Sequence, residues 1–129
     1  LKKATEAVAE PKKKLEAAAA ALLKAGVRKW VIIHFREGAL AMSHTGECLL
    51  QGSLSIPSDK VAGSAGAGDA FAAGVLWATH EQKSMQEALL TGVAAAASSL
   101  FAPGCSDSVL PVNELSDLAR QYPPSALLQ

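Results

Sequence analysis

The chain has 129 residues, half of them hydrophobic, and twelve basic residues balance twelve acidic ones, so the formal net charge is zero. This length fits a single domain, and the apolar content is high enough for a packed core, which excludes a largely disordered chain. A neutral chain lacks the positive surface of a nucleic-acid-binding protein, and no apolar run approaches the roughly 18 residues that span a bilayer, so we expect neither nucleic acid nor a membrane as a partner.

The first predicted element is a helix over residues 10–25. Apolar residues recur there at helical spacing, Pro11 suits the first helical position, and Gly26 suits the end of the helix. The basic run 12–14 is expected to be a solvated helix face rather than a phosphate or membrane patch. The chain begins without Met inside helix-forming sequence, so we expect a fragment or a processed chain.

Residues 30–35 form a continuous apolar run that predicts a central strand covered on both faces. A helix followed closely by such a strand indicates an α/β fold, and we expect parallel strands with helices packed on the sheet. Shorter strands are expected at 39–42 and 48–50, and a loop over 53–59.

Three further helices are predicted over residues 69–80, 84–101 and 112–121. Ser84 and Glu87 form a capping-box pattern at the start of the second of these. Its alanines allow the close approach of another helix or of a ligand. The first of these helices is expected to have an apolar face made by Phe71, Ala72, Val75, Leu76 and Thr79.

The cysteines and histidines follow no metal-binding spacing. They are Cys48, Cys105, His34, His44 and His80. We therefore expect free thiols in a reducing, cytoplasmic environment.

The glycine-rich stretch 60–68 directly precedes a predicted helix. Small residues at a helix N-terminus leave backbone N–H groups free to bind an anion, and the helix dipole adds partial positive charge, so we expect a phosphate site here. A Walker A loop needs Lys where Asp69 stands, and the dinucleotide-binding fingerprint needs Gly where Phe71 stands, so neither motif fits.

Asp69 at the head of this helix has two interpretations. It is either an N-cap that accepts backbone N–H groups of the first turn or a catalytic base. In phosphoryl transfer to an alcohol, a carboxylate orients the hydroxyl and accepts its proton. The adjacent amides of Ala67 and Gly68 would then stabilise charge on the moving phosphoryl group.

Residues 66–74, Gly-Ala-Gly-Asp-Ala-Phe-Ala-Ala-Gly, resemble the C-terminal signature of the ribokinase-like, phosphofructokinase-B type sugar kinases. The resemblance extends over roughly residues 10–122 and implies the C-terminal portion of a three-layer α/β/α fold. It also implies ATP and Mg²⁺ as cofactors and a small polyhydroxylated substrate. The resemblance further implies that Asp69 is the general base and that the anion hole consists of Gly66, Ala67 and Gly68.

The resemblance also implies nucleotide contacts, with Val93 and Ala97 near the adenine. Many family members carry Thr-x-Gly-x-x-Gly after the buried strand, where it touches ATP phosphates, and this chain keeps only the last glycine, Gly38. His34 or Arg36 substitutes there as a phosphate contact, or His34 is simply packed. Both alternatives stay open.

The family often binds a monovalent cation such as K⁺ beside the anion hole. The matching positions lie near Ala65, Ser99, Ala102, Gly104 and Ser108. Gly63, which precedes the signature, offers no side-chain ligand.

Members of this family are much longer than this chain. Residues 1–129 are therefore expected to be a partial domain with the nucleotide-binding and catalytic portion, without the N-terminal acceptor and lid portion, and inactive alone. We expect a cytoplasmic carbohydrate kinase that forms homo-oligomers. The alternatives are a nucleoside or vitamin-precursor kinase of the same fold and a non-catalytic nucleotide-binding module.

Overall fold

The structure, a computed structural model, describes residues 2–126 and the side chains from residue 11 onward. Residues 2–126 form four α-helices, three strands and a short 3₁₀ helix. In chain order these are α1 (Lys2–Lys24), β1 (Trp30–Phe35), β2 (Gly38–Ser43), β3 (Cys48–Gly52), η1 (Ser58–Lys60), α2 (Ala67–His80), α3 (Met85–Ser99) and α4 (Val112–Gln121).

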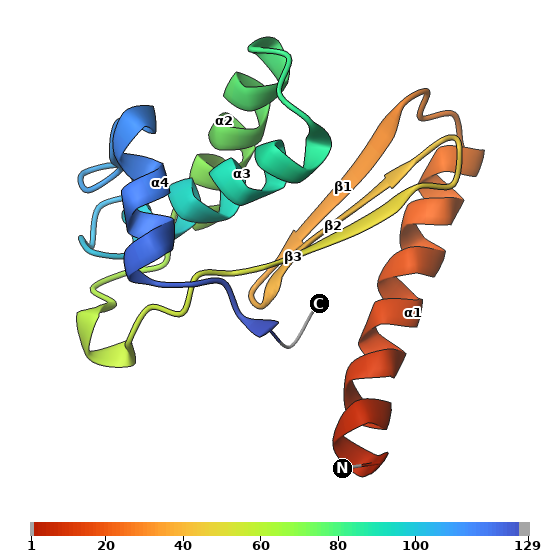
Figure 1. Cartoon of the computed structure of the whole chain (residues 1–129), viewed down its shortest axis with the longest axis horizontal. Helices are drawn as coiled ribbons and strands as arrows, with labels where there is room; N and C mark the ends of the chain where they lie inside the picture. Colours follow the sequence, from red (N-terminus) through yellow and green to blue (C-terminus); the bar gives the residue numbers. More distant parts are fainter. Residues whose placement is uncertain (1, 127–129) are drawn as a thin grey trace.

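The elements form three layers (Figure 1), with α1 on one face of the sheet and α2, α3 and α4 on the other. Side chains alternate between the two faces of a strand, so Val31 packs toward α1 while Ile32 packs toward α2 and α3. The predicted α/β class is confirmed, and so is the expected cover on both faces of residues 30–35.

The expectation of parallel strands was wrong. The sheet has the order β1-β2-β3 and both pairings are antiparallel. Phe35 pairs with Gly38, so only Arg36 and Glu37 connect β1 to β2. A parallel connection needs a crossover of a dozen or more residues, so this short turn allows only an antiparallel hairpin. Within these three strands β2 is therefore central, and β1 lies at an edge.

Helix α1 begins earlier than predicted. It already includes residues 2–10, so Pro11 lies inside the helix and not at its first position. Pro11 is exposed, and the basic run 12–14 is exposed too, in agreement with a solvated face. On the opposite side Ala19 packs with Val31 and Leu40 and ties the helix to the sheet.

Helices α2 and α3 approach each other through two glycines. A Cβ on Gly74 would lie 3.0 Å from the Cα of Gly92, and a Cβ on Gly92 would lie 2.8 Å from the ring of Phe71. The buried face of α2 is rotated from the predicted one, and Leu76 is 70% exposed. The buried residues of α2 are Ala70, Phe71, Gly74, Val75 and Ala78.

The predicted capping box is confirmed at the start of α3. The Ser84 hydroxyl accepts the N–H of Glu87, and the Glu87 carboxylate accepts the N–H of Ser84. The pKa of Glu87 is held below its usual value by the hydrogen bonds that its carboxylate accepts from the N–H and the hydroxyl of Ser84. Helix α4, predicted over 112–121, has these same bounds and packs Leu115 and Leu118 into the core beside α3.

The segment after α4 returns to the loop that follows β3. The Ser55 N–H donates to the carbonyl of Pro123, and Leu54 bridges to Pro124. Lys60 of η1 donates to the Tyr122 hydroxyl at 2.9 Å. These contacts hold residues 53–60 against residues 122–124, which directly follow α4.

The two cysteines are exposed and unpaired. Within the described part of the chain, no group of three or more His, Cys, Asp or Glu side chains is placed to hold a metal ion. Across the same residues, no helix combines the length and apolar character that a bilayer crossing requires.

Candidate active site

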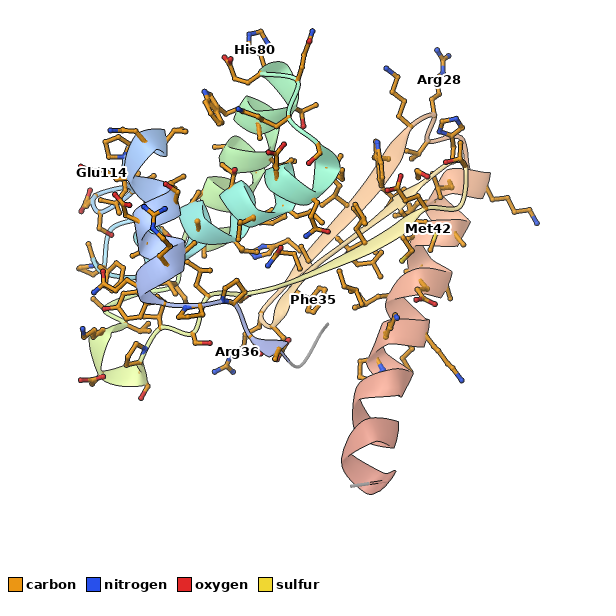
Figure 2. All side chains as sticks on the ribbon, in the orientation of Figure 1. Arg28, Phe35, Arg36, Met42, His80 and Glu114 are labelled. Atoms are coloured by element: carbon orange, nitrogen blue, oxygen red, sulfur yellow. The ribbon has the colours of Figure 1, made fainter. Side chains whose placement is uncertain are left out.

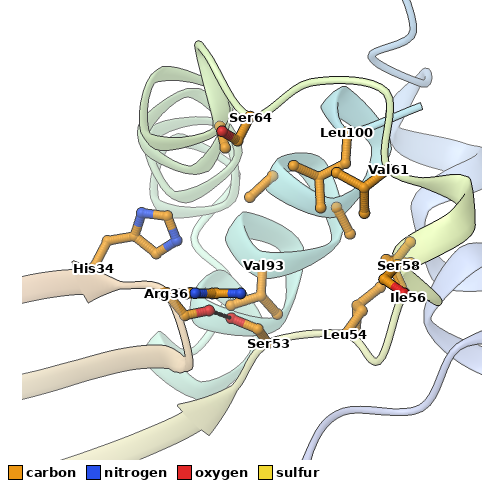
Figure 3. Close-up of a pocket in the computed structure, with 13 residues that line it drawn as sticks. His34, Arg36, Ser53, Leu54, Ile56, Ser58, Val61, Ser64, Val93 and Leu100 are labelled. Carbon is orange, nitrogen blue, oxygen red and sulfur yellow. Dashed lines mark hydrogen bonds between the residues drawn. The ribbon is translucent and has the colours of Figure 1, made fainter. Parts of the chain in front are cut away.

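A cavity of about 730 Å³ lies between the sheet, the N-terminus of α2 and helix α3 (Figure 3). Its walls come from four separate segments, which are the end of β1 with the following turn, the loop 53–58, the stretch 61–67, and α3. The residues that line it are His34, Arg36, Ser53, Leu54, Ile56, Ser58, Val61, Ser64, Ala67, Val93, Ala96, Ala97 and Leu100.

The cavity wall has two chemical characters. Most of the side chains from α3, from residues 54–56 and from Val61 are apolar, which suits a flat, weakly polar ring. The polar side chains are His34 at the end of β1, Arg36 in the turn after it, Ser53, and Ser64 before α2 (Figure 3). The cavity therefore suits a molecule with one apolar and one anionic part.

The start of α2 is shaped by a backbone conformation that glycine favours. Gly66 is the N-cap with φ 85°, and a Cβ there would lie 2.7 Å from the carbonyl oxygen of Cys105. The Ala67 N–H donates to the Ser64 carbonyl at 3.3 Å. The amides of Gly68 and Asp69 belong to the first turn, where N–H groups have no partner within the helix. Of the two amides predicted for the anion hole, that of Gly68 lies in the first turn of α2, whereas that of Ala67 is bonded to Ser64; anion binding here stays a prediction.

Asp69 is the third residue of α2, and because Gly66 is the N-cap, the interpretation of Asp69 as an N-cap is wrong. Its side chain is exposed. No ion pair of its carboxylate is found among the described side chains, whose pairs are Lys12–Glu16 and Arg120–Asp117. Asp69, Gly66 and Gly68 do not line the cavity themselves, but Asp69 lies in the same first turn of α2 as Ala67, which does.

His34 lies between the cavity and the first turns of α2. Its ring stacks on Phe71, with 4.2 Å between the centroids and 4° between the planes. A Cβ placed on Gly68 would lie 3.9 Å from Nδ1 of His34. Burial lowers the pKa of His34 from its usual value, which favours a neutral ring. His34 is thus packed, as one of the two sequence interpretations expected, and it also lines the cavity, while its role as a phosphate contact stays a prediction.

The predicted nucleotide residues are brought together only in part. Val93 and Ala97 both line the cavity. Gly38 is buried at the start of β2, paired with Phe35 and Gly52, and does not line it. The sequence analysis missed the contribution of the loop 53–58, where apolar Leu54 and Ile56 at alternate positions were the available signal.

The positions predicted for a monovalent cation lie close to one another in part. Gly63 lies against Ala102 and Pro103, since a Cβ there would be 2.9 Å from the Cα of Pro103. The hydroxyls of Ser99 and Ser108 both donate to backbone carbonyls of α3, which are those of Ala96 and Ser98. The residues present offer mainly carbonyl oxygens, which are ligands of the kind that hard cations prefer. A cation here stays a prediction.

A sequence model of the pfkB family of carbohydrate kinases matches residues 2–113. The chain therefore belongs to this family, as the signature at residues 66–74 predicted. A comparison with curated protein sequences gave no significant match.

Solved structures with the same fold are ribokinases and related kinases. The ribokinase of Thermotoga maritima is 28% identical, with a TM-score of 0.70 over 81% of this chain and 34% of that one. The ribokinase of Arabidopsis thaliana, solved with ribose and ATP, is 29% identical, with a TM-score of 0.71 over 80% of this chain and 32% of its own. A putative ribokinase II of E. coli, solved with ATP and Mg²⁺, has a TM-score of 0.73 at 22% identity, over 83% of this chain and 33% of that one. The chain thus spans about a third of the length of these proteins.

Proposed function

We propose that this chain is the nucleotide-binding and catalytic portion of an ATP-dependent kinase that phosphorylates a hydroxyl of a sugar or sugar-like substrate. The observation that carries the proposal is the exposed Asp69 carboxylate in the first turn of α2, beside amides that have no helical partner. A base and an anion cradle in one helical turn are what phosphoryl transfer to an alcohol requires.

The division of the cavity supports ATP as the donor. The apolar walls from Val93 and Ala97 suit the adenine, and the polar walls near Ala67 suit the phosphates. The Arabidopsis ribokinase, 29% identical, was solved with ribose and ATP, which supports the same substrate classes here. Mg²⁺ bound to ATP would neutralise phosphate charge, and it keeps several water ligands, so it needs few protein ligands.

Asp69 orients the acceptor hydroxyl and accepts its proton. The Gly68 and Asp69 amides, with Ala67 and Gly66 in the same loop, stabilise charge on the transferred phosphoryl group. Catalysis by these groups depends on a substrate held in line with the phosphate. We place the acceptor-binding side chains outside residues 1–129, and we expect the complete protein to act in the cytoplasm as a homo-oligomer.

The test is Asp69→Asn in the complete protein. Asn keeps the shape of the side chain but is not a base, so kcat should fall about 10²–10⁴-fold while the Kd for ATP stays unchanged. Glu81→Gln is the matched control, because Glu81 is exposed at the opposite end of the same helix. Turnover of Asp69→Asn equal to that of the control would refute the assignment of the base. A complete wild-type protein that binds ATP but shows no turnover would instead be a non-catalytic nucleotide-binding module.

A further inference from the structure

One side of the cavity consists of apolar side chains from two segments that are far apart in the sequence. The first segment is the loop before α2, and the second is α3 with the residue that ends it. We call this set the apolar wall, and its members are Leu54, Ile56, Val61, Val93, Ala96, Ala97 and Leu100. Figure 3 shows the labelled members on the side of the cavity away from His34. Such a wall suits a flat ring.

Backbone N–H groups of the apolar wall already have partners within the chain. Those of Ile56 and Val61 donate to carbonyls of their own loop, at 3.0 and 3.3 Å. The N–H of Ala62, which follows directly, donates to the carbonyl of Leu100 at 2.8 Å. The members that α3 contributes lie inside that helix, where each N–H bonds to a carbonyl of the preceding turn. These N–H groups are therefore not available to the edge of a bound base.

The polar side chains of the cavity are poorly suited to distinguish one base from another. Among the described residues that line it, none is Asn, Gln, Asp or Glu. Arg36 is exposed, and its side chain points away from the helices (Figure 2). The Ser53 hydroxyl is already bonded to the Arg36 carbonyl at 3.0 Å. Ser58 belongs to the same loop as Val61, but a hydroxyl both donates and accepts, so it serves an amino group and a carbonyl group of a base equally well.

We propose that the cavity selects its nucleotide by the shape of a purine ring and not by the groups on the ring edge, so that the complete protein accepts GTP nearly as well as ATP. This inference rests on the proposed function, because it assumes that the apolar wall holds the base of the phosphate donor. A site built on hydrogen bonds rejects a ring with different edge groups strongly, whereas an apolar site rejects it weakly. A purine also covers more of the apolar wall than a pyrimidine does.

The test is the affinity of the complete protein for the Mg²⁺ complexes of ATP, GTP, CTP and UTP, measured by calorimetry. The Kd values for ATP and GTP should agree within about tenfold, because the cavity offers an apolar surface to both rings. CTP and UTP should bind about three- to tenfold more weakly than the weaker of the two purine nucleotides, because a single ring buries less apolar surface.

Val61→Ala tests the contact between the apolar wall and the base. Val61 lines the cavity and is 40% exposed, so its truncation leaves no hole in the core. The variant should weaken ATP and GTP binding by the same factor, about two- to fivefold. Val109→Ala is the matched control, because Val109 is 39% exposed and does not line the cavity, and it should leave all the affinities unchanged.

A preference between ATP and GTP larger than about tenfold would overturn the inference, since a group that reads the ring edge would then be present. Equal affinity for purine and pyrimidine nucleotides would overturn it as well, and so would Val61→Ala with the affinities of Val109→Ala. Each of these results, with ATP still bound by the wild type, leaves the proposed function standing. A wild-type protein that binds none of the nucleotides overturns the proposed function and the inference together.

Discussion

The imidazole of His34 lies parallel to the ring of Phe71, with 4.2 Å between the ring centroids. The stack joins the end of β1 to the second turn of α2 and so links one cavity wall to the helix that carries Asp69. Parallel ring pairs contribute about 0.5–1.5 kcal/mol beyond their buried area. A double-mutant cycle with His34→Ala and Phe71→Leu should therefore give a coupling free energy of that size in urea unfolding. Additive effects, within about 0.3 kcal/mol, would show that the rings are neighbours without coupling.

The stability of the protein should depend on pH through His34. Burial lowers the pKa of His34 from its usual 6.5, so the unfolded chain binds more protons than the folded one. The unfolding free energy should fall as the pH drops below about 6.5 and stop falling once the pH is under the lowered pKa. Comparing chemical unfolding of His34→Gln and His80→Gln between pH 5 and 8 isolates this contribution. The same pH dependence in both variants would assign it to other groups.

Gly66→Ala should destabilise the protein more than Gly46→Ala. Both glycines have positive φ values, 85° and 92°, and an L residue in such a conformation costs about 1–2 kcal/mol. A Cβ at Gly46 would meet nothing within 4 Å, whereas a Cβ at Gly66 would lie 2.7 Å from the Cys105 carbonyl oxygen. We expect a further ~1–3 kcal/mol for Gly66→Ala from this overlap. Equal unfolding free energies of the two variants would contradict the close approach of Cys105.

Gly92→Ala should destabilise the protein although alanine favours helices by about 1 kcal/mol over glycine. A Cβ at this position would lie 2.7 Å from Cγ2 of Val75 and 2.8 Å from the ring of Phe71. Separating α2 from α3 would expose core surface, so we expect a net cost of about 1–3 kcal/mol. Thermal unfolding measures the change, and a raised Tm would show that the two helices are not in close contact here.

The 129-residue chain alone should not release ADP in response to any sugar or nucleoside. The chain contains Asp69 and the anion cradle that we propose, but phosphoryl transfer also requires an acceptor hydroxyl held in line with the phosphate. The measurement is an ADP-release assay over a panel of sugars and nucleosides, with the complete protein as the positive control. Sugar-dependent turnover of roughly 1–100 s⁻¹ would place the acceptor site within these residues.

Local signals in the sequence predicted most helices well. The capping box of Ser84 and Glu87 fixed the start of α3, and helix α4 has its predicted bounds. The buried face of α2 was predicted less well because Ala and Gly occur on every side of this helix. The spacing of its apolar residues therefore distinguishes the buried face from the exposed one poorly. The packing at Gly74 depends on Gly92 of another helix, which no local pattern reveals.

The antiparallel direction of β1 and β2 was predictable from the short connection between them. The two residues between Phe35 and Gly38 are too few for a parallel connection.

The glycine loop and Asp69 were identified because they are contiguous in sequence. The loop at residues 53–58 was not, since its place at the cavity results from pairing with Pro123 and Pro124, far along the chain.

That pairing brings the segment after α4 against a loop of the cavity wall, although the segment itself does not line the cavity. Gly74 and Gly92 allow α2 and α3 to pack in close contact, so these two walls belong to one packed unit. The remaining wall contains Leu54 and Ile56, and the residue between them, Ser55, donates its N–H to the carbonyl of Pro123. For the nucleotide that we propose this cavity binds, the width left for the base would therefore depend on the segment after α4, although no residue of that segment lines the cavity.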